Sequence, residues 1–280
     1  MRSGPGRKAV LVALVVALGT ALGAIYRYAF FAEPRQVVVE GVSVPLSCLP
    51  PTFSGLRLVQ VSDLHIGPAV DAGIVRAGLA QALALEPDAI VLTGDYVSSL
   101  SHGEAATLEA KLSRLAAPMG VYAVLGNHDH WTRPTAVGEA IRRAGVTLLR
   151  NEAVALRRGD AVLYLAGVDD VWEGQADLAR ALAEVPPGAC TILLAHEPDY
   201  ADEVASDGRV ALQLSGHSHG GQVRLPGLPR VLPTLARRYP EGLRKVGEMY
   251  LYTNRGLGMA NLPLRFNCPP EITLIELRAP

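Results

Sequence analysis

Several sequence features are scarce in this chain, and each scarcity excludes a class of protein. The 280 residues include only three cysteines, and none of them form a CxxC pair, which argues against a structural zinc site built from thiolates. The formal net charge is -1, so the basic excess of a protein that binds nucleic acid in bulk is missing, and we expect no nucleic-acid partner. Charged residues make up 19% and apolar residues 49%, so we expect a large core rather than disorder.

The three cysteines leave the redox state of the chain open. Cys190 lies in the apolar run CTILLA, and its simplest interpretation is a buried core residue. Cys48 and Cys268 both lie beside prolines in loop-like segments. They could form a disulfide in an oxidising compartment, but the sequence does not show whether they are close.

The N-terminal segment is a long apolar run. Residues 9–25 are apolar except for Thr20 and the glycines, and aromatic residues continue to Phe31. At about 1.5 Å per residue the run nearly spans the hydrocarbon core of a bilayer. We favour an uncleaved signal anchor over a cleaved signal peptide, and over a core helix because the run lacks a polar face. More basic residues precede the run than follow it, which predicts that residues 1–35 anchor a domain at residues 36–280 on the outer side of the cell membrane.

Apolar periodicity predicts an α/β protein after the anchor. We expect strands at residues 37–44, 56–61, 89–92, 121–125, 146–149, 153–156, 161–166, 191–195, 210–214, 248–253 and 271–277. We expect helices at residues 72–85, 104–115, 135–144 and 177–183.

Five of these apolar strands end at a polar residue that can bind a metal. These residues are Asp63, Asp95, Asn127, His196 and His217. In α/β sheets, ligand sites form outside the carboxyl ends of the strands. We therefore expect the five strand ends to converge on one crevice.

The strand ends carry a set of short motifs, each of which is unremarkable alone. The set consists of Asp63-Leu64-His65, Gly94-Asp95, Gly126-Asn127-His128-Asp129, His196 and Gly216-His217-Ser218-His219. Imidazole, carboxylate and amide oxygen together suit Mn, Fe or Zn. A carboxylate can bridge two such ions about 3.5–4 Å apart, which can hold the attacking and leaving oxygens of a displacement. Strand alternation would direct Asp63 and His65 to the same side.

The motifs resemble those of the calcineurin-like metallophosphoesterase superfamily, in the family's order over residues 56–222. The tail, with Asn254-Arg255-Gly256-Leu257-Gly258 and Arg265, resembles a branch of membrane-anchored bacterial phosphoesterases, some of which act on cell-envelope or lipid-linked phosphodiesters. The resemblance implies two packed mixed β-sheets flanked by helices in a four-layer sandwich, and two divalent metal ions.

The resemblance also implies roles for individual residues. One metal would take Asp63, His65 and His219, and the other Asn127, His196 and His217, with Asp95 bridging them. His128 would give a proton to the leaving oxygen or stabilise developing charge, and Asp129 would orient His128 or its loop. The substrate contacts would come from Asn127, His128 and Arg255.

Several alternatives remain open at this point. The chain is expected to hydrolyse a phosphodiester or phosphomonoester, but a non-catalytic scaffold of the same fold and a cytosol-facing phosphoprotein phosphatase are the competing functions. His102 is expected in a surface loop, while His130 and Trp131 either contact substrate or pack their loop. Residues 222–246 are rich in arginine, leucine and proline. They form either a solvated loop whose leucines cap the core or a basic, partly apolar lip that rests on anionic headgroups.

Overall fold

The computed structural model describes residues 6–67, 70, 72–98 and 104–280, and the expectation for His102 lies outside them. Within these residues the strands form two six-stranded sheets. The order in the first sheet is β1-β12-β2-β3-β4-β5. Its strands are β1 (Val38–Pro45), β12 (Glu271–Arg278), β2 (Arg57–Val61), β3 (Ala89–Thr93), β4 (Val121–Val124) and β5 (Thr147–Leu148). Because β2 to β5 are parallel, their carboxyl ends meet at one edge.

The second sheet has the order β10-β11-β9-β8-β7-β6. Its strands are β10 (Gly242–Val246), β11 (Met249–Thr253), β9 (Leu212–Ser215), β8 (Thr191–Leu194), β7 (Ala161–Gly167) and β6 (Glu152–Arg158). The four strands β11, β9, β8 and β7 are parallel, while β10 and β6 are antiparallel additions at the edges. In the first sheet, β12 is parallel to β1 and antiparallel to β2, so both sheets are mixed.

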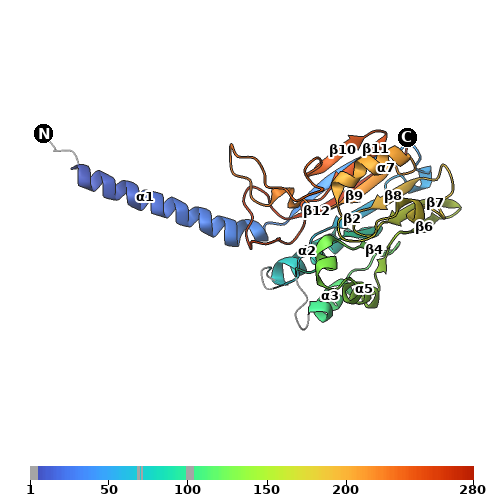
Figure 1. The fold of residues 1–280 in the computed structure, drawn as a ribbon, viewed down its shortest axis with the longest axis horizontal. Helices are drawn as coiled ribbons and strands as arrows, with labels where there is room; N and C mark the ends of the chain where they lie inside the picture. The colour runs from blue at the N-terminus through green and yellow to red at the C-terminus, as the bar shows by residue number, and fades with distance from the viewer. Residues whose placement is uncertain (1–5, 68–69, 71, 99–103) are drawn as a thin grey trace.

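The two sheets pack face to face, and helices cover their outer faces (Figure 1). The helices of this body are α2 (Ala72–Ala84), α3 (Glu104–Leu112), α4 (Asn127–Thr132), α5 (Pro134–Arg143), α6 (Leu178–Ala181) and α7 (Ala201–Asp207). On β3, Val91 packs between the sheets while Ile90 and Leu92 pack under α2, α3 and α5. Burial on both faces explains why these strands are continuous apolar runs.

The expected elements are largely confirmed, with boundaries shifted by a few residues. The segments missed are α7, β10 and the short helix α4 inside the Asn127 motif. The signal for β10 was weak because it lies in the arginine- and proline-rich segment 222–246. That segment is otherwise irregular, as its prolines require.

The helix α1 (Arg7–Arg27) projects from the body, with none of its residues buried (Figure 1). It is long and apolar enough to cross a membrane by length and composition. Its end is tied to the loop before β12. The backbone N–H of Arg265 donates to the Ala29 carbonyl at 3.0 Å, and the Glu33 carboxylate accepts from the N–H of Asn267 at 2.9 Å. The apolar helix therefore has a fixed departure point on the body.

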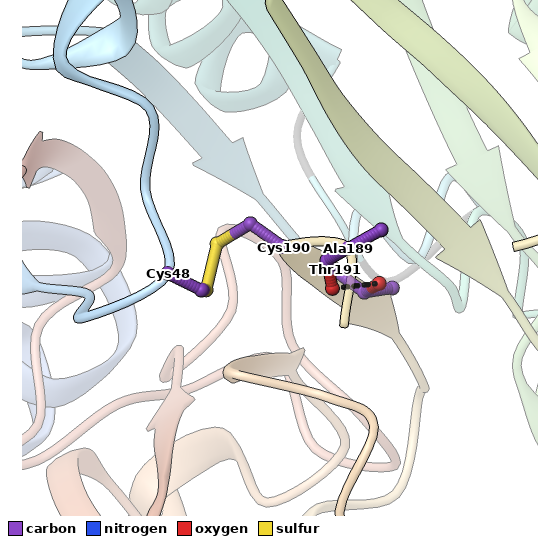
Figure 2. The surroundings of a disulfide bond; sticks show 4 residues. All are labelled: Cys48, Ala189, Cys190 and Thr191. Atoms are coloured by element: carbon purple, nitrogen blue, oxygen red, sulfur yellow. Dashed lines mark hydrogen bonds between the residues drawn. A yellow bond between two sulfur atoms is a disulfide. The ribbon is translucent and has the colours of Figure 1, made fainter. Parts of the chain in front are cut away.

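The cysteine pairing differs from the one left open by the sequence. Cys48 forms a disulfide with Cys190, whose Cα atoms lie 5.1 Å apart, next to the start of β8 (Figure 2). The Cys190 prediction was right about burial and missed the partner. Cys268 is a buried free thiol that donates to the His219 carbonyl at 3.2 Å. The Cys48–Cys268 alternative is therefore wrong in this structure.

Candidate metal centre

The polar residues at the strand ends converge where the two sheets meet. Gln60 of β2 joins the sheets there, since its buried amide donates to Thr93 Oγ1 at 3.0 Å and to the Ser215 carbonyl at 2.9 Å. The residues that follow the first sheet's strands are Asp63, His65, Asp95 and Asn127, and those that follow the second sheet's are His196, His217 and His219. All are buried. The expectation of one crevice is thus met by the geometry.

One group of ligand atoms comes from Asp63, His65 and His219. His65 Nε2 lies 3.0 Å from His219 Nε2, which in turn lies 3.3 Å from Asp63 Oδ1. Burial lowers the pKa of His65 to about 3, and burial also holds the pKa of His219 well below its ordinary value. Both imidazoles are therefore neutral at pH 7, the form that binds a metal ion.

A second group comes from Asp95, His196 and His217. His196 Nδ1 faces the Thr93 carbonyl at 2.6 Å, and His217 Nε2 faces the Thr234 carbonyl at 2.8 Å. Because a carbonyl only accepts, these nitrogens carry the protons, as is usual for metal-binding histidines. The other two ring nitrogens face each other at 3.2 Å.

Asp95 lies between the two groups. Its Oδ2 is 3.5 Å from His65 Nε2 and 3.3 Å from His196 Nε2. Its Oδ1 accepts the backbone N–H of His128 at 2.9 Å, which fixes the carboxylate. This is the position that a bridging carboxylate requires.

The residues present fit a pair of cations. In the second group, facing ring nitrogens satisfy each other only through a shared proton or a cation. The Oδ1 of Asn127 is buried and has no hydrogen-bond partner within the described residues. Burial alone would lower the pKa of His196, but Asp95 and Asp63 raise it well above its ordinary value. The anionic pocket thus holds positive charge at the position that a metal ion would take.

The backbone at the centre is unusual. Ligand residues with positive φ are Asp63 (53°), His65 (46°), Asp95 (56°), His217 (67°) and His219 (48°). Left-handed backbone is uncommon for residues with a side chain and concentrates at functional sites. The side chains of Asp63 and His65 therefore converge through loop geometry beyond β2, and the prediction that strand alternation aligns them was wrong in its reasoning.

Glycines admit this close packing where a side chain would collide. A Cβ on Gly126 would lie 2.4 Å from Asp95 Oδ1, and one on Gly216 would lie 1.9 Å from Ser62 Oγ. The glycines before Asn127 and His217 are thus required by close approach.

His128 and Asp129 lie on α4 beside the ligands and differ in what they do. The His128 ring is edge-on to His65 at 4.7 Å between centroids and lines the pocket. Burial lowers its pKa, although the Asp95 carboxylate opposes the shift. Asp129 is buried and accepts the backbone N–H groups of Asp95 at 3.0 Å, Tyr96 at 2.9 Å and Gly126 at 3.0 Å. It ties the Asp95 loop to its own loop through backbone N–H groups, and its predicted role in orienting His128 or that loop stays a prediction.

Arg255 requires a correction. Its guanidinium donates to the carboxylates of Glu271 and Glu40, and it is not among the residues lining the pocket. Pairing with two acids, Glu271 of β12 and Glu40 of β1, occupies the guanidinium, so this geometry does not support the predicted substrate contact. The fully buried Arg265 supports the same loop, donating to the carbonyls of Gly258 and Cys268.

A pocket of about 720 Å³ opens from the centre. Asn127, which is buried, and His128, which is partly buried, line its inner part. Its outer part is lined by four exposed side chains that we name the apolar rim: Leu225, Leu228, Val231 and Leu262, with exposed fractions of 50%, 62%, 85% and 57%. The leucines of segment 222–246 therefore do not simply cap the core.

The basic part of the expected lip is largely paired. Arg224 and Arg230 both contact the Glu241 carboxylate, and Arg238 contacts Asp202. His130, whose role was open, donates to Asp169 at 3.0 Å and packs its loop. Trp172 lines the pocket and was not predicted, because nothing in its sequence context marks it.

Comparison with known proteins defines the class. The family described as Calcineurin-like phosphoesterase matches residues 56–221, and the chain belongs to this family. It is 36% identical over 263 residues to the metallophosphoesterase YkuE of Bacillus subtilis, covering 92% of this chain and 91% of that protein. It is 33% identical over 279 residues to Phosphodiesterase YaeI of Escherichia coli, covering 97% and 98%.

A third relative is named for its substrate. UDP-2,3-diacylglucosamine pyrophosphatase LpxG of Chlamydia trachomatis is 28% identical over 325 residues, covering 95% of this chain and 98% of that protein. The family and these relatives show that the chain is a metal-dependent phosphoric ester hydrolase. Calcineurin-like phosphoesterases use a dinuclear divalent metal site, and the two groups of candidate ligands described above are present in this chain.

Proposed function

We propose that this chain is a membrane-anchored phosphodiesterase that hydrolyses a lipid-linked phosphate ester at the outer face of the cell membrane. The observation that carries the proposal is the continuity of one pocket from the candidate ligands to the apolar rim. A phosphate at the centre would leave an attached hydrocarbon chain to lie against the rim. The polar phosphate and the apolar chain of an amphiphilic substrate would thus each contact a surface of matching polarity.

The chain's own residues divide the work. Asp63, His65 and His219 would hold one ion, Asn127, His196 and His217 would hold the other, and Asp95 would bridge them. The ions, when bound, stabilise the attacking and leaving oxygens of an in-line displacement. His128 would give its proton to the leaving oxygen, since a bound phosphate dianion or diester favours the charged imidazolium. Mn, Fe and Zn remain the candidate metals, because no thiolate is offered.

Membrane attachment has two supports. The helix α1 is apolar along a length that can span a bilayer. The rim lies near its departure point, because Gln222 pairs with Ala260 and Leu262 in the loop whose Arg265 and Asn267 contact the end of the helix. Figure 1 shows these loops at the end of the body from which α1 projects.

The disulfide supports the outward orientation. Disulfides such as Cys48–Cys190 persist in oxidising compartments and are rare in the cytosol. A reporter that fluoresces only in the cytoplasm, fused after Pro280, should stay dark. A bright fusion overturns the orientation, and recovery of a mature protein beginning near residue 25 would replace the anchor with a cleaved signal.

The substrate class is tested with the full chain in detergent micelles. We compare kcat/KM for a long-chain lipid phosphodiester with that for a short-chain analogue. In Leu228→Ser and Val231→Ser this ratio should fall roughly tenfold, because each loses about 1.5–3 kcal/mol of apolar contact at full burial. Leu228→Met keeps the apolar surface and should keep the ratio.

The outcomes separate the candidate functions. If the ratio is unchanged in both serine variants, the proposal of a lipid-linked substrate is wrong, and the assignment as a phosphoesterase still stands. Failure of the metal-loaded wild-type chain to hydrolyse any ester would favour the non-catalytic scaffold. Such a scaffold has no need of the His128 ring beside the ligand groups.

A further inference from the structure

The chain has two tryptophans, and both line the pocket of the metal centre. Trp131 is 51% exposed and Trp172 is 39% exposed. Tryptophan is highly buried on average, so exposing both rings leaves apolar surface in water without a structural reason. Exposed aromatic side chains concentrated in a pocket indicate ligand contact.

The two indoles form a continuous row of rings with the candidate site histidines. Ring centroids are 4.6 Å apart for His128 and Trp131, 5.5 Å for Trp131 and Trp172, and 5.8 Å for Trp172 and His217. The two indole planes meet at 74°. They therefore form a corner rather than a closed stack, and their exposed area stays open to a third ring.

Both tryptophans lie in segments whose backbone is held by hydrogen bonds. Trp131 lies in α4, where the Thr132 hydroxyl is 3.0 Å from the His128 carbonyl. The loop of Trp172 is fastened by buried Asp170, whose Oδ1 accepts the N–H of Trp172 at 3.1 Å, and by buried Glu197, whose Oε2 accepts the N–H of Val171 at 3.1 Å. Two buried acidic side chains thus hold the backbone of the loop that carries Trp172, which is the support expected for a preorganised binding surface.

We propose that Trp131 and Trp172 form a stacking subsite for a planar aromatic ring of the nucleobase kind, carried on the phosphate that the metal centre hydrolyses. The inference rests on the proposed function, because it places the ring beside His128. The subsite gives the pocket two specificity surfaces, with the indoles beside the centre and the apolar rim further out. Stacking tolerates any base, since every base has a π face.

The test uses intrinsic fluorescence of the full-length, metal-loaded chain in detergent. Because the tryptophans number two, Trp131→Phe and Trp172→Phe each leave one indole as the reporter. UMP is compared with ribose 5-phosphate and inorganic phosphate by stopped-flow mixing, before turnover. UMP should quench each remaining indole saturably, and ribose 5-phosphate should not. In Trp131→Ala and Trp172→Ala, the dissociation constant for UMP should rise about tenfold, while the phenylalanine variants should largely restore it.

Two results would overturn the inference. One is equal quenching by UMP and ribose 5-phosphate, which would indicate a sugar or phosphate site. The other is the absence of quenching by UMP in both phenylalanine variants. The experiment measures binding and not hydrolysis. If UMP stacks on the indoles of a chain that hydrolyses no ester, that result would contradict the proposed function and leave the stacking subsite in place. If the chain hydrolyses an ester but UMP does not stack on the indoles, that result would contradict only the stacking subsite.

Discussion

The metal centre and the apolar rim lie in one pocket and are built by opposite means. At the centre, Asp63 and His65 are fully buried. The Asp63 carboxylate accepts the backbone N–H of His217 at 3.1 Å, and His65 Nδ1 lies 3.1 Å from the Ser98 hydroxyl. At the rim, Val231 is 85% exposed in a segment without regular structure. A buried, over-determined site fixes the chemistry, whereas an exposed surface determines which molecules reach it.

Gln222 joins the two regions. It follows the turn that carries His219, with a positive φ of 52°. Its side chain donates to the carbonyls of Ala260 and Leu262 at 3.0 Å and accepts the N–H of Ala260 at 2.9 Å. This amide, with backbone bonds between residues 222–224 and Phe266, links the segment that follows His219 to the loop that carries Leu262 of the rim.

Asp95→Asn should have the largest effect. The bridging charge between the two ligand groups disappears, so both ions should bind more weakly and the metal content should fall from about two per chain. Elemental analysis of the purified chain measures this directly. The matched control is Asp169→Asn, a buried acid that pairs with His130 and Arg150 instead. Retention of both metals in Asp95→Asn would contradict the bridging assignment.

His128→Ala should separate chemistry from metal binding. We expect near-normal metal content and a kcat lower by roughly 10²–10⁴-fold, if His128 is the proton donor. That loss is equivalent to about 2.7–5.4 kcal/mol. His130→Ala, two residues further along α4, is the matched control and should lose much less. His128 also lies near His65 and Asp95 as a third group of candidate ligands, so loss of metal from His128→Ala would make it a ligand.

The centre could be predicted from the sequence to a degree that the rim could not. Asp95 and His196 each follow an apolar strand in the sequence, and both lie at the ends of those strands in the structure. What fixes their geometry is not local, because the carbonyls of Thr93 and Thr234 that set the histidine tautomers carry no side-chain signature. The left-handed backbone at Asp63 could not be predicted either, because an aspartate in the sequence does not indicate the φ angle of its backbone.

The errors have the same physical origin. Arg255 was assigned to substrate because it lies in a motif, yet Glu271 and Glu40 bind it from strands that the sequence does not place beside it. Cys190 and Cys48 are separated by 142 residues, and their meeting depends on how the second sheet packs on the first. Contacts between residues so far apart in the sequence depend on tertiary packing, so a local sequence pattern does not predict them.

Removing the disulfide tests whether the centre is rigid by itself. Cys48→Ser should lower the free energy of unfolding by about 2–4 kcal/mol, measured by thermal or denaturant unfolding. The bond lies at the start of β8, and the candidate ligand His196 follows the other end of that strand. Metal content should therefore stay normal at temperatures where the variant is folded. Loss of metal from the folded variant would show that the centre depends on the far end of the sheets.

The smallest effect is expected from charge around the rim. Within the described residues, the exposed Arg237 side chain has no carboxylate partner, and it follows shortly after the pocket-lining Pro233. One cation near an anionic surface contributes about 1 kcal/mol, and the effect fades within a Debye length of about 8–10 Å. In Arg237→Gln, kcat/KM for a lipid-linked ester in anionic nanodiscs should therefore fall by about fivefold or less, relative to zwitterionic nanodiscs.

Arg143→Gln makes the same charge change on α5, which covers the first sheet away from the rim (Figure 1), and should leave that ratio unchanged. Raising the salt concentration should abolish the Arg237 effect and leave the Leu228→Ser effect in place, because screening acts on charge and not on apolar contact. An equal fall in both arginine variants would assign the effect to net charge. A fall in Arg237→Gln larger than that in Leu228→Ser would reverse the ranking, and the rim would then act as a basic surface rather than an apolar one.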